Sequence, residues 1–306
     1  NGQSQAAGER KLIEDRLAKT AEIRSRGFDP YPPRFNRTHT TVEAVALFQS
    51  LEEGDSESDF GTHTVRVAGR VMARRGQGKA SFIDVKDGHG SIQVFARQNT
   101  MGDESYAILD LLDIGDIIGI EGVVIRTRRG EISVEAQVIT LLTKAIRPLP
   151  DKWHGLQDQE VRFRQRYLDL ISNEKAMQNA LLRSKVVRSM RDFMHSRGFI
   201  EVETPILVPI AAGAQATPFA THHNQLNRDL YLRIATELYL KKLIVGGIER
   251  VFEIGRLFRN EGLDHDHNPE FTTIESYQAY ADYNDVMCMV EEMVSQIAQD
   301  TTGSMI

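Results

Sequence analysis

The 306-residue sequence has little cysteine and no long apolar run. Cys288 is the only cysteine, so the chain cannot form an internal disulfide framework or a cysteine-based zinc site. This scarcity is typical of a reducing compartment, and we expect a cytoplasmic protein. No apolar run approaches the roughly 20 residues of a membrane span, and the polar start NGQSQAAGER lacks a signal-peptide core. We therefore expect no membrane partner.

The chain also lacks an overall positive charge, with a formal net charge of −6. The basic residues are unevenly spread: positions 61–97 hold seven of them against two acidic residues, and Arg126, Arg128 and Arg129 follow. From position 282 onward there are five acidic residues and no basic one. A locally positive unit on an acidic protein suits binding to a phosphate backbone. A solvated strand surface explains the same charges equally well.

Length and composition favour two folded units. The chain exceeds one average domain, and 41% apolar with 26% charged residues is typical of a globular protein with a core in each unit. It begins without Met and stops at TTGSMI, just after an apolar helix-like stretch, so we expect a portion of a longer protein.

The first unit is expected to be a β-barrel preceded by helices. Residues 9–27 and 41–51 have helical patterns, whereas residues 64–143 consist of five β-rich runs separated by glycine-bearing turns. A helical insert at 103–115 separates the third run from the fourth. This order predicts a small closed barrel of the OB type, and a plain five-stranded β unit remains the alternative.

The second unit is expected to begin near Gln159, after the proline-containing linker KAIRPLPDKWHG. Its pattern predicts a long amphipathic helix at 173–197 and a mostly buried helix at 236–247 closed by two glycines. Two strands flank the stretch RNEGLDHDHNPEF at 259–271. The fold class is therefore α+β, an OB barrel followed by an antiparallel sheet with flanking helices.

Strand alternation places an unusual set of side chains on one face of the hairpin that surrounds this stretch. If 250–261 pairs with 270–280 in antiparallel fashion, one face carries Arg259, Glu261, Phe271, Glu275 and Tyr277. A guanidinium matches a phosphate or carboxylate, and an aromatic plane can stack on a nucleobase. Carboxylates suit ammonium groups or the amino group of an adenine, so the face favours a nucleotide.

A metal site is the competing interpretation of the stretch Asp264, His265, Asp266 and His267. These residues are consecutive, so in an extended segment only every second one can converge, and the chain offers no His-Glu-x-x-His motif. We expect no metal site within this chain. A merely polar loop remains open as a further alternative.

The motifs resemble those of class II aminoacyl-tRNA synthetases. FRNEG followed by HNPEFTTIE resembles motif 2, and RGFIEVETPIL resembles motif 1, with Pro205 in its dimer interface. RYLDLI and YLRIATELYLKKLIVGG are similar to the lysyl-tRNA synthetase branch, and VAGRVMARRGQGKASFIDVKD is similar to its anticodon-binding barrel. The resemblance implies a helical extension at 1–60, the barrel at 61–144, a linker at 145–165 and an incomplete catalytic domain at 166–306.

The resemblance also implies roles for individual residues. Arg259 and Glu261 are expected to be catalytic. The expected ATP-binding residues are Arg259, Glu261, His267, Asn268 and Phe271. The expected lysine-binding residues are Gly213, Glu237, Arg259, Glu275 and Tyr277. The expected anticodon-binding residues are Arg74, Phe82, Gln93, Phe95 and Glu131, with Phe82, Gln93 and Phe95 on one face beside Arg74.

The implied function is lysine–tRNA ligation: ATP-dependent formation of lysyl-adenylate, then transfer to tRNA(Lys) by a homodimer. Motif 3 and the Mg²⁺ ligands are expected beyond Ile306. Asp266 and the run AAGA around Ala212 depart from the usual pattern. The alternatives are an aspartyl or asparaginyl relative and a paralogue that lysylates a protein, which would generally lack the barrel. A further alternative is that the chain is a truncated, non-catalytic fragment that binds tRNA.

Overall fold

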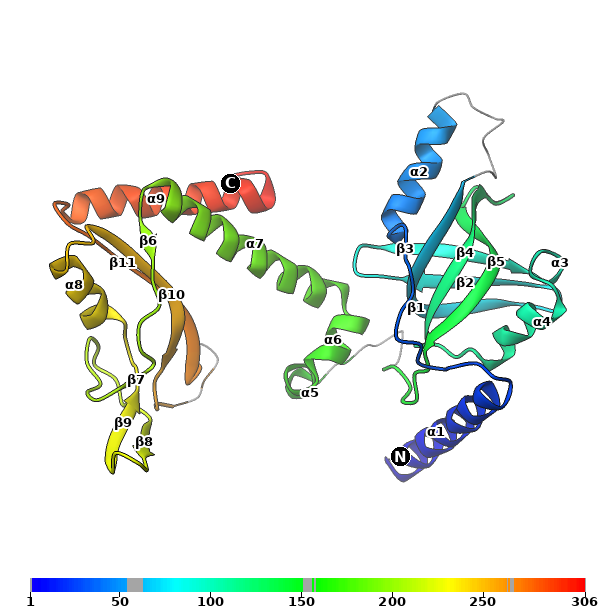
Figure 1. The fold of residues 1–306 in the computed structure, drawn as a ribbon, viewed down its shortest axis with the longest axis horizontal. Helices are drawn as coiled ribbons and strands as arrows, with labels where there is room; N and C mark the ends of the chain where they lie inside the picture. The colour runs from blue at the N-terminus through cyan, green and yellow to red at the C-terminus, as the bar shows by residue number, and fades with distance from the viewer. Residues whose placement is uncertain are drawn as a thin grey trace. The chain divides into compact units, whose positions relative to one another are not determined.

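The computed structural model describes residues 2–53, 63–150, 156, 158–262, 264 and 267–305. The chain divides into two compact units, Asn1–Asn173 and Glu174–Ile306, and each is described by itself (Figure 1). Among the described helices, none has the length and apolar character needed to cross a membrane.

Five strands form a closed barrel in the first unit, in the order β1-β2-β3-β5-β4. They are β1 (Thr64–Gln77), β2 (Ala80–Lys86), β3 (Ser91–Arg97), β4 (Ile117–Arg126) and β5 (Ile132–Thr143). Inward side chains alternate with outward ones, so Ile83 and Val85 of β2 are fully buried while their neighbours are half-buried. The predicted OB-type barrel is confirmed.

Short helices fill the connection between β3 and β4, as the sequence predicted. They are α3 (Gln98–Met101), α4 (Asp103–Tyr106) and the 3-10 helix η2 (Ala107–Leu111). Two longer helices precede the barrel, α1 (Gly2–Ser25) and α2 (Thr41–Glu53), and two follow it, α5 (Gln159–Arg164) and α6 (Arg166–Ser172).

Buried charges tie α1 to the barrel. Arg16 donates to the carbonyl oxygens of Ala145 and Ile114 at 2.8 and 3.0 Å. The fully buried ammonium of Lys144 lies 2.5 Å from Asp113 and 2.7 Å from Asp116. Each buried charge therefore has a partner, which offsets its desolvation.

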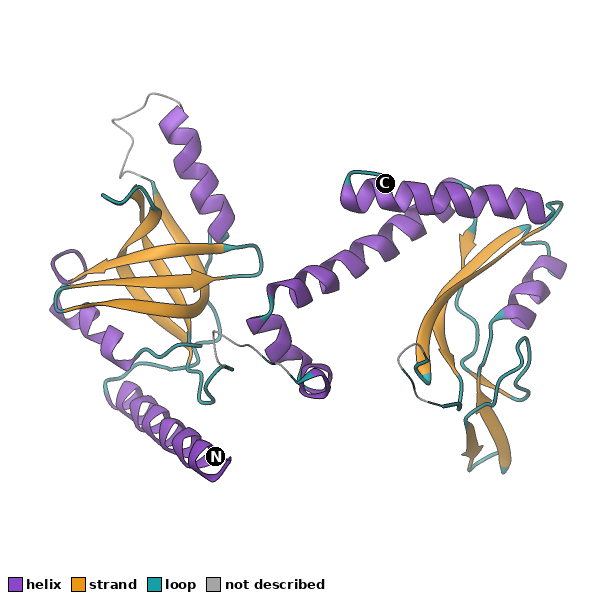
Figure 2. Ribbon diagram, turned by 180° about the vertical axis from the view of Figure 1, so that it is seen from behind, coloured by secondary structure: helices purple, strands orange, loops and turns teal. Residues whose placement is uncertain are grey.

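The second unit packs two helices against a small sheet (Figure 2). β10 (Arg250–Phe258) pairs with β11 (Glu270–Gln278) in antiparallel fashion and with β6 (Ile200–Glu201) in parallel. A second sheet has the order β7 (Leu207–Val208), β9 (Arg228–Leu232) and β8 (Ala220–His223). The helices are α7 (Glu174–Ser196), α8 (Glu237–Val245) and α9 (Tyr283–Thr302). One cluster of buried core residues in this unit comprises Phe193, Met194, Phe199, Phe252, Met289 and Met293.

Two expectations about the helices of this unit are corrected. The helix that begins at Glu237 is not mostly buried, because only one side of it meets β10 and β11. Leu240 is its only buried residue, and Val245 is 88% exposed. The amphipathic pattern of α7 predicted one apolar side, which includes Leu181 and Met194, but this side is not buried throughout, since Leu181 is 51% exposed whereas Met194 is 1% exposed.

Candidate functional site

The first group of site residues lies where β10 and β11 end. Leu257 pairs with Phe271, and just beyond this pair the Arg259 amide donates to the Pro269 carbonyl oxygen at 2.9 Å. The Arg259 guanidinium carbon lies 5.2 Å from the centroid of the Phe271 ring. Its buried Nε has no hydrogen-bond partner among the described residues. Because buried polar atoms normally have partners, this arginine is suited to an anionic ligand.

Arg259 and Phe271 line a pocket of about 230 Å³. Its walls also include Glu261, Gly262, His267, Asn268 and Pro269. The expected nucleotide-binding residues thus converge, although Arg259 and Glu261 lie just past the end of β10.

Hydrogen bonds hold the residues around this pocket in place. The Thr217 amide donates to Glu261 at 3.4 Å, and the Asn260 amide donates to the Thr217 carbonyl oxygen at 2.8 Å. The His267 ring nitrogen Nδ1 lies 2.8 Å from the Asp264 carboxylate, and the His267 amide donates to Asp264 at 2.8 Å. His267 is therefore held within the hairpin loop, at the pocket.

The metal interpretation of this loop concerns Asp264, His265, Asp266 and His267, of which the structure describes Asp264 and His267. Within the described parts of the chain, no three His, Cys, Asp or Glu side chains lie close enough to hold a cation. His265 and Asp266 lie outside the described residues.

A second group of residues lies along the same face of the hairpin. Glu275 and Tyr277 of β11 share this face, and Glu237 begins α8 nearby. Glu275 accepts a hydrogen bond from the Thr236 amide at 3.3 Å, and Lys241 donates to Glu237 at 2.5 Å. Burial raises the pKa of Tyr277 to about 12, and the negative charges of Glu275 and Glu237 add to the effect. The phenol is therefore protonated at neutral pH, beside two carboxylates.

Gly213 lies against Glu237, as the sequence led us to expect. Its φ of +95° belongs to the left-handed region, which glycine enters without strain. A Cβ on Gly213 would lie 3.0 Å from the Ala235 Cβ and 3.1 Å from the Glu237 Cβ. The backbone thus comes close to Glu237 because residue 213 has no side chain.

A buried ion pair supports this face, and the sequence did not reveal it. Arg233 and Glu253 lie 2.6 Å apart, with each side chain 4% exposed. Arg233 also donates to the carbonyl oxygens of Arg256 and Thr204. Glu253 is directly opposite Glu275 in the β10-β11 register, so Arg233 offsets one of two facing carboxylates. The sequence did contain one sign of this pair, because a glutamate within an apolar strand is expected to have a buried partner. The partner, Arg233, is 20 residues away in the sequence and could not be identified from it.

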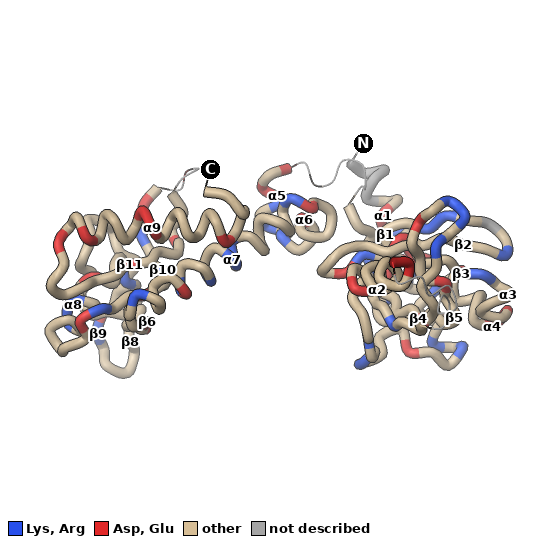
Figure 3. Tube along the Cα trace, turned by 90° about the horizontal axis from the view of Figure 1, so that it is seen from above, with Lys and Arg blue, Asp and Glu red and all other residues tan. Residues whose placement is uncertain are grey.

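The third group lies on the barrel, in a pocket that contains Phe82, Gln93, Phe95 and Glu131. The rings of Phe82 and Phe95 are stacked, with centroids 4.6 Å apart and planes inclined by 9°. Five arginines also line this pocket, namely Arg75, Arg97, Arg126, Arg128 and Arg129. Figure 3 shows basic residues along the barrel strands. Stacked rings beside arginines suit single-stranded nucleic acid.

The placement of Arg74 beside these residues is corrected. The two-residue turn at Gly78 and Lys79 pairs Arg75 with Phe82, and Arg74 with Ile83. Arg74 therefore points away from the pocket, donates to the Leu109 carbonyl oxygen and lies 3.6 Å from Asp110. Arg75 takes its place on the pocket face. The register of the turn decides whether Arg74 or Arg75 lies on the face of Phe82, and alternation within one strand does not determine that register.

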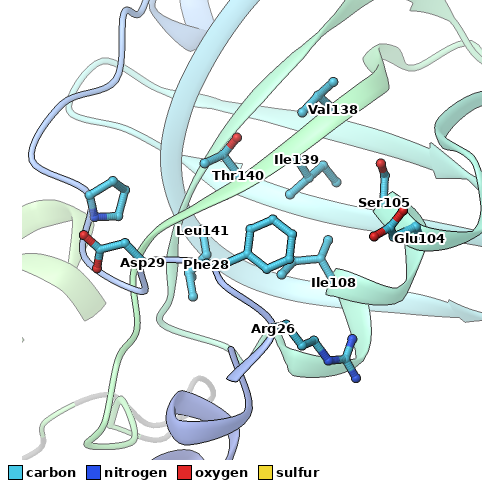
Figure 4. A pocket seen from close by; sticks show the side chains of 11 residues that line it. Arg26, Phe28, Asp29, Glu104, Ser105, Ile108, Val138, Ile139, Thr140 and Leu141 are labelled. Atoms are coloured by element: carbon cyan, nitrogen blue, oxygen red, sulfur yellow. The ribbon is translucent and has the colours of Figure 1, made fainter. Parts of the chain in front are cut away.

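Another pocket of the first unit, of about 320 Å³, was not foreseen from the sequence (Figure 4). Figure 4 shows the Phe28 ring beside Ile108, with Asp29 and Glu104 at the edge. Its floor includes Ile139 and Leu141 of β5, so it is an apolar depression with a mixed polar rim.

Comparisons with known proteins show what each part of the chain is similar to. Residues 158–305 match the family of tRNA synthetases class II (D, K and N), and residues 65–142 match the OB-fold nucleic acid binding domain. A lysine–tRNA ligase of Dehalococcoides mccartyi strain 195 is 55% identical over 96% of the chain and 59% of its own length. Lysine–tRNA ligases of Carboxydothermus hydrogenoformans and Bacillus cereus are 50% and 51% identical over 96% and 94% of the chain. The chain spans about three fifths of the length of these relatives, 59% and 58% respectively.

Proposed function

Since the chain belongs to the class II tRNA synthetases of the D, K and N group, we propose that it is part of a lysine–tRNA ligase. The observation that carries this proposal is the shared face of the β10-β11 hairpin. There an arginine and an aromatic ring lie beside a group formed by Glu237, Glu275 and the protonated Tyr277. Two carboxylates and a phenol suit a cationic amino acid better than an acidic or neutral one, which favours lysine over aspartate or asparagine.

The first step joins lysine to ATP. A carboxylate oxygen of lysine attacks the α-phosphorus, the bond to the bridging oxygen breaks, and pyrophosphate leaves with its electron pair. Arg259 holds the α-phosphate and the lysine carboxylate with its guanidinium, because its Nε has no protein partner among the described residues. Glu261, His267 and Asn268 line the same pocket and contact the adenine and the phosphates.

Phe271 stacks on the adenine. A base placed between Phe271 and Arg259 would need about 7 Å, two stacking distances, whereas the two groups are 5.2 Å apart. The adenine therefore uses ring surface of Phe271 that Arg259 leaves open. Arg259 is then free to face the phosphates.

Lysine is bound through its ammonium groups. Glu237, packed against Gly213, binds the α-ammonium, and the carboxylate is favoured there because it lies at the N-terminus of α8. Glu275 and Tyr277 line the side-chain pocket. Mg²⁺ serves the family, but the described residues contain no ligand cluster that fits it, so no step is assigned to a metal.

The second step transfers lysine to tRNA. The hydroxyl of the terminal adenosine attacks the carbonyl carbon of lysyl-adenylate, and AMP leaves. The barrel selects the tRNA(Lys) anticodon by stacking on Phe82 and Phe95 and by hydrogen bonds to Gln93 and Glu131. We assign Arg74 no base contact, since it faces Asp110.

The wider organisation is part of the same proposal. The extension 1–60, the barrel 61–144, the linker 145–165 and the catalytic part 166–306 form one subunit of a cytoplasmic homodimer. The segment around Pro205 contributes to the dimer contact.

Lysine-dependent exchange of pyrophosphate into ATP by the full-length enzyme tests the proposal. Arg259→Ala removes the charge-stabilising donor and is expected to lower the exchange rate by about 10²–10³. Arg256→Ala is the matched control, because Arg256 is 54% exposed and pairs with Glu270 on the strands' surface. Unchanged exchange in Arg259→Ala would overturn the assignment, and faster exchange with aspartate or asparagine would favour those relatives.

A further inference from the structure

The Gln93 side chain is held at both ends of its amide. Its Nε2 donates to Glu131 at 3.0 Å, and its Oε1 accepts from the Ser133 hydroxyl at 3.1 Å. Gln93 of β3 and Ser133 of β5 are direct partners in the parallel register. Ser133 is fully buried and Gln93 is 9% exposed.

These two contacts allow only one orientation of the amide. A carboxylate can only accept hydrogen bonds, so the amide nitrogen must face Glu131. Turning the amide over would place Oε1 against the carboxylate, two acceptors in contact. The Ser133 hydroxyl lies 3.5 Å from the Glu131 carbonyl oxygen and 3.1 Å from the Gln93 Oε1, so it donates to Oε1, the nearer acceptor.

Glu131 is itself fixed by the backbone. Its amide donates to the Thr127 hydroxyl at 3.2 Å, and its carbonyl oxygen accepts from the Thr127 amide at 2.9 Å. Arg126 donates to the Gly130 carbonyl oxygen at 2.6 Å, which closes the same turn. The carboxylate that orients Gln93 therefore stands on a tight turn between β4 and β5.

The orientation of an amide matters for pyrimidines. At the edge formed by N3 and the group on C4, uracil presents a donor and an acceptor, whereas cytosine presents an acceptor and a donor. For a base that stacks in one position, an amide with a fixed orientation can match only one of them with two hydrogen bonds. In Gln93, one proton of Nε2 and one lone pair of Oε1 remain for a base.

We propose that Ser133 is a positioning residue that fixes the Gln93 amide, together with Glu131, so that the barrel prefers uracil to cytosine. This rests on the proposed anticodon-binding function of the barrel. Ser133 touches no base itself, because it is fully buried beneath Gln93.

Binding of short RNA hairpins to the 306-residue chain tests the proposal. One hairpin carries three consecutive uridines in its loop, and in three others each uridine in turn is cytidine. Ser133→Ala removes one hydrogen bond, so we expect the preference for uridine at one position to fall about fivefold. Ser133→Thr keeps the hydroxyl and should keep the preference. Ser81→Ala is the matched control, because Ser81 is 2% exposed in the same barrel and its hydroxyl lies 3.3 Å from Tyr106.

A double-mutant cycle separates positioning from a general structural effect. In a Gln93→Ala background, the additional Ser133→Ala change should leave the binding constants unaltered, because the amide to be positioned is gone. A wild-type chain that does not prefer any uridine would overturn the proposed anticodon function. A wild-type chain that prefers uridine, with the same preference in Ser133→Ala, would overturn only the role of Ser133.

Discussion

Replacing Arg233 by methionine should destabilise the second unit severely. The change keeps a long side chain but leaves the Glu253 carboxylate, which is 4% exposed, without its cation at 2.6 Å. It also removes the donors to the Arg256 and Thr204 carbonyl oxygens. Breaking one partner out of a buried ion pair costs about 3–5 kcal/mol, so we expect a loss of that size in the free energy of unfolding.

Amide hydrogen exchange in β10 and β11 measures this loss locally, and the barrel serves as the internal control. The double variant Arg233→Met with Glu253→Gln removes both charges and should regain most of the stability. Arg233→Lys should have a stability between those of the wild type and Arg233→Met, because a lysine ammonium keeps the positive charge but cannot donate in the planar geometry of the guanidinium. A loss below about 1 kcal/mol in Arg233→Met, or an equal loss in the double variant, would refute the reasoning.

Further predictions concern the barrel and the glycine beside α8. Lys144→Met should lower the free energy of unfolding of the first unit by about 3 kcal/mol, as measured by thermal unfolding. Lys19→Met should lower it by about 1 kcal/mol or less, because the Lys19 side chain is 30% exposed and its ion pair with Asp113 is partly in water. Burial alone would raise the pKa of Asp113, but its hydrogen bonds to Lys144 and Lys19 lower it overall. Its contribution to stability is therefore complete above the ordinary value of 3.8 and is lost as the pH falls through the lowered pKa, a dependence that acid titration of Lys144→Met should show weakened. Gly213→Ala would place a methyl group 3.1 Å from the Glu237 Cβ at a positive φ, so the KM for lysine in pyrophosphate exchange should rise several-fold while the KM for ATP changes little.

Alternation was enough to predict which side chains of β11 share the face of the hairpin. A strand has a period of two, so Phe271, Glu275 and Tyr277 had to share a face once the segment was identified as a strand. The register that pairs Leu257 with Phe271 brings Arg259 opposite Pro269, where the Arg259 amide donates to the Pro269 carbonyl oxygen. The five-stranded barrel followed in the same way, from runs of β-forming residues separated by glycine turns.

Features that depend on exact register or on distant partners could not be predicted. Arg74 and Arg75 are adjacent and identical, and only the turn that pairs Gln77 with Ala80 decides which one faces Phe82. The sequence also predicted too much burial for α8. An apolar sequence indicates which residues of a helix can be buried, but it does not indicate which other elements pack against them.

The pair of Arg233 and Glu253 explains how the hairpin can present carboxylates to a ligand. Glu253 and Glu275 are directly opposite each other, and two uncompensated carboxylates there would repel. Arg233 neutralises the buried one, so Glu275 remains the carboxylate of this pair that is available to a cation. Glu237 adds a second negative charge, which forms an ion pair with Lys241. The Lys241 side chain is 54% exposed, so its ammonium group can move into water when another cation binds Glu237. A ligand with an ammonium group can therefore replace Lys241 at Glu237 without leaving a buried charge unpaired. In the proposed function, the binding of lysine therefore depends on the buried Arg233–Glu253 pair as well as on the carboxylates of the face.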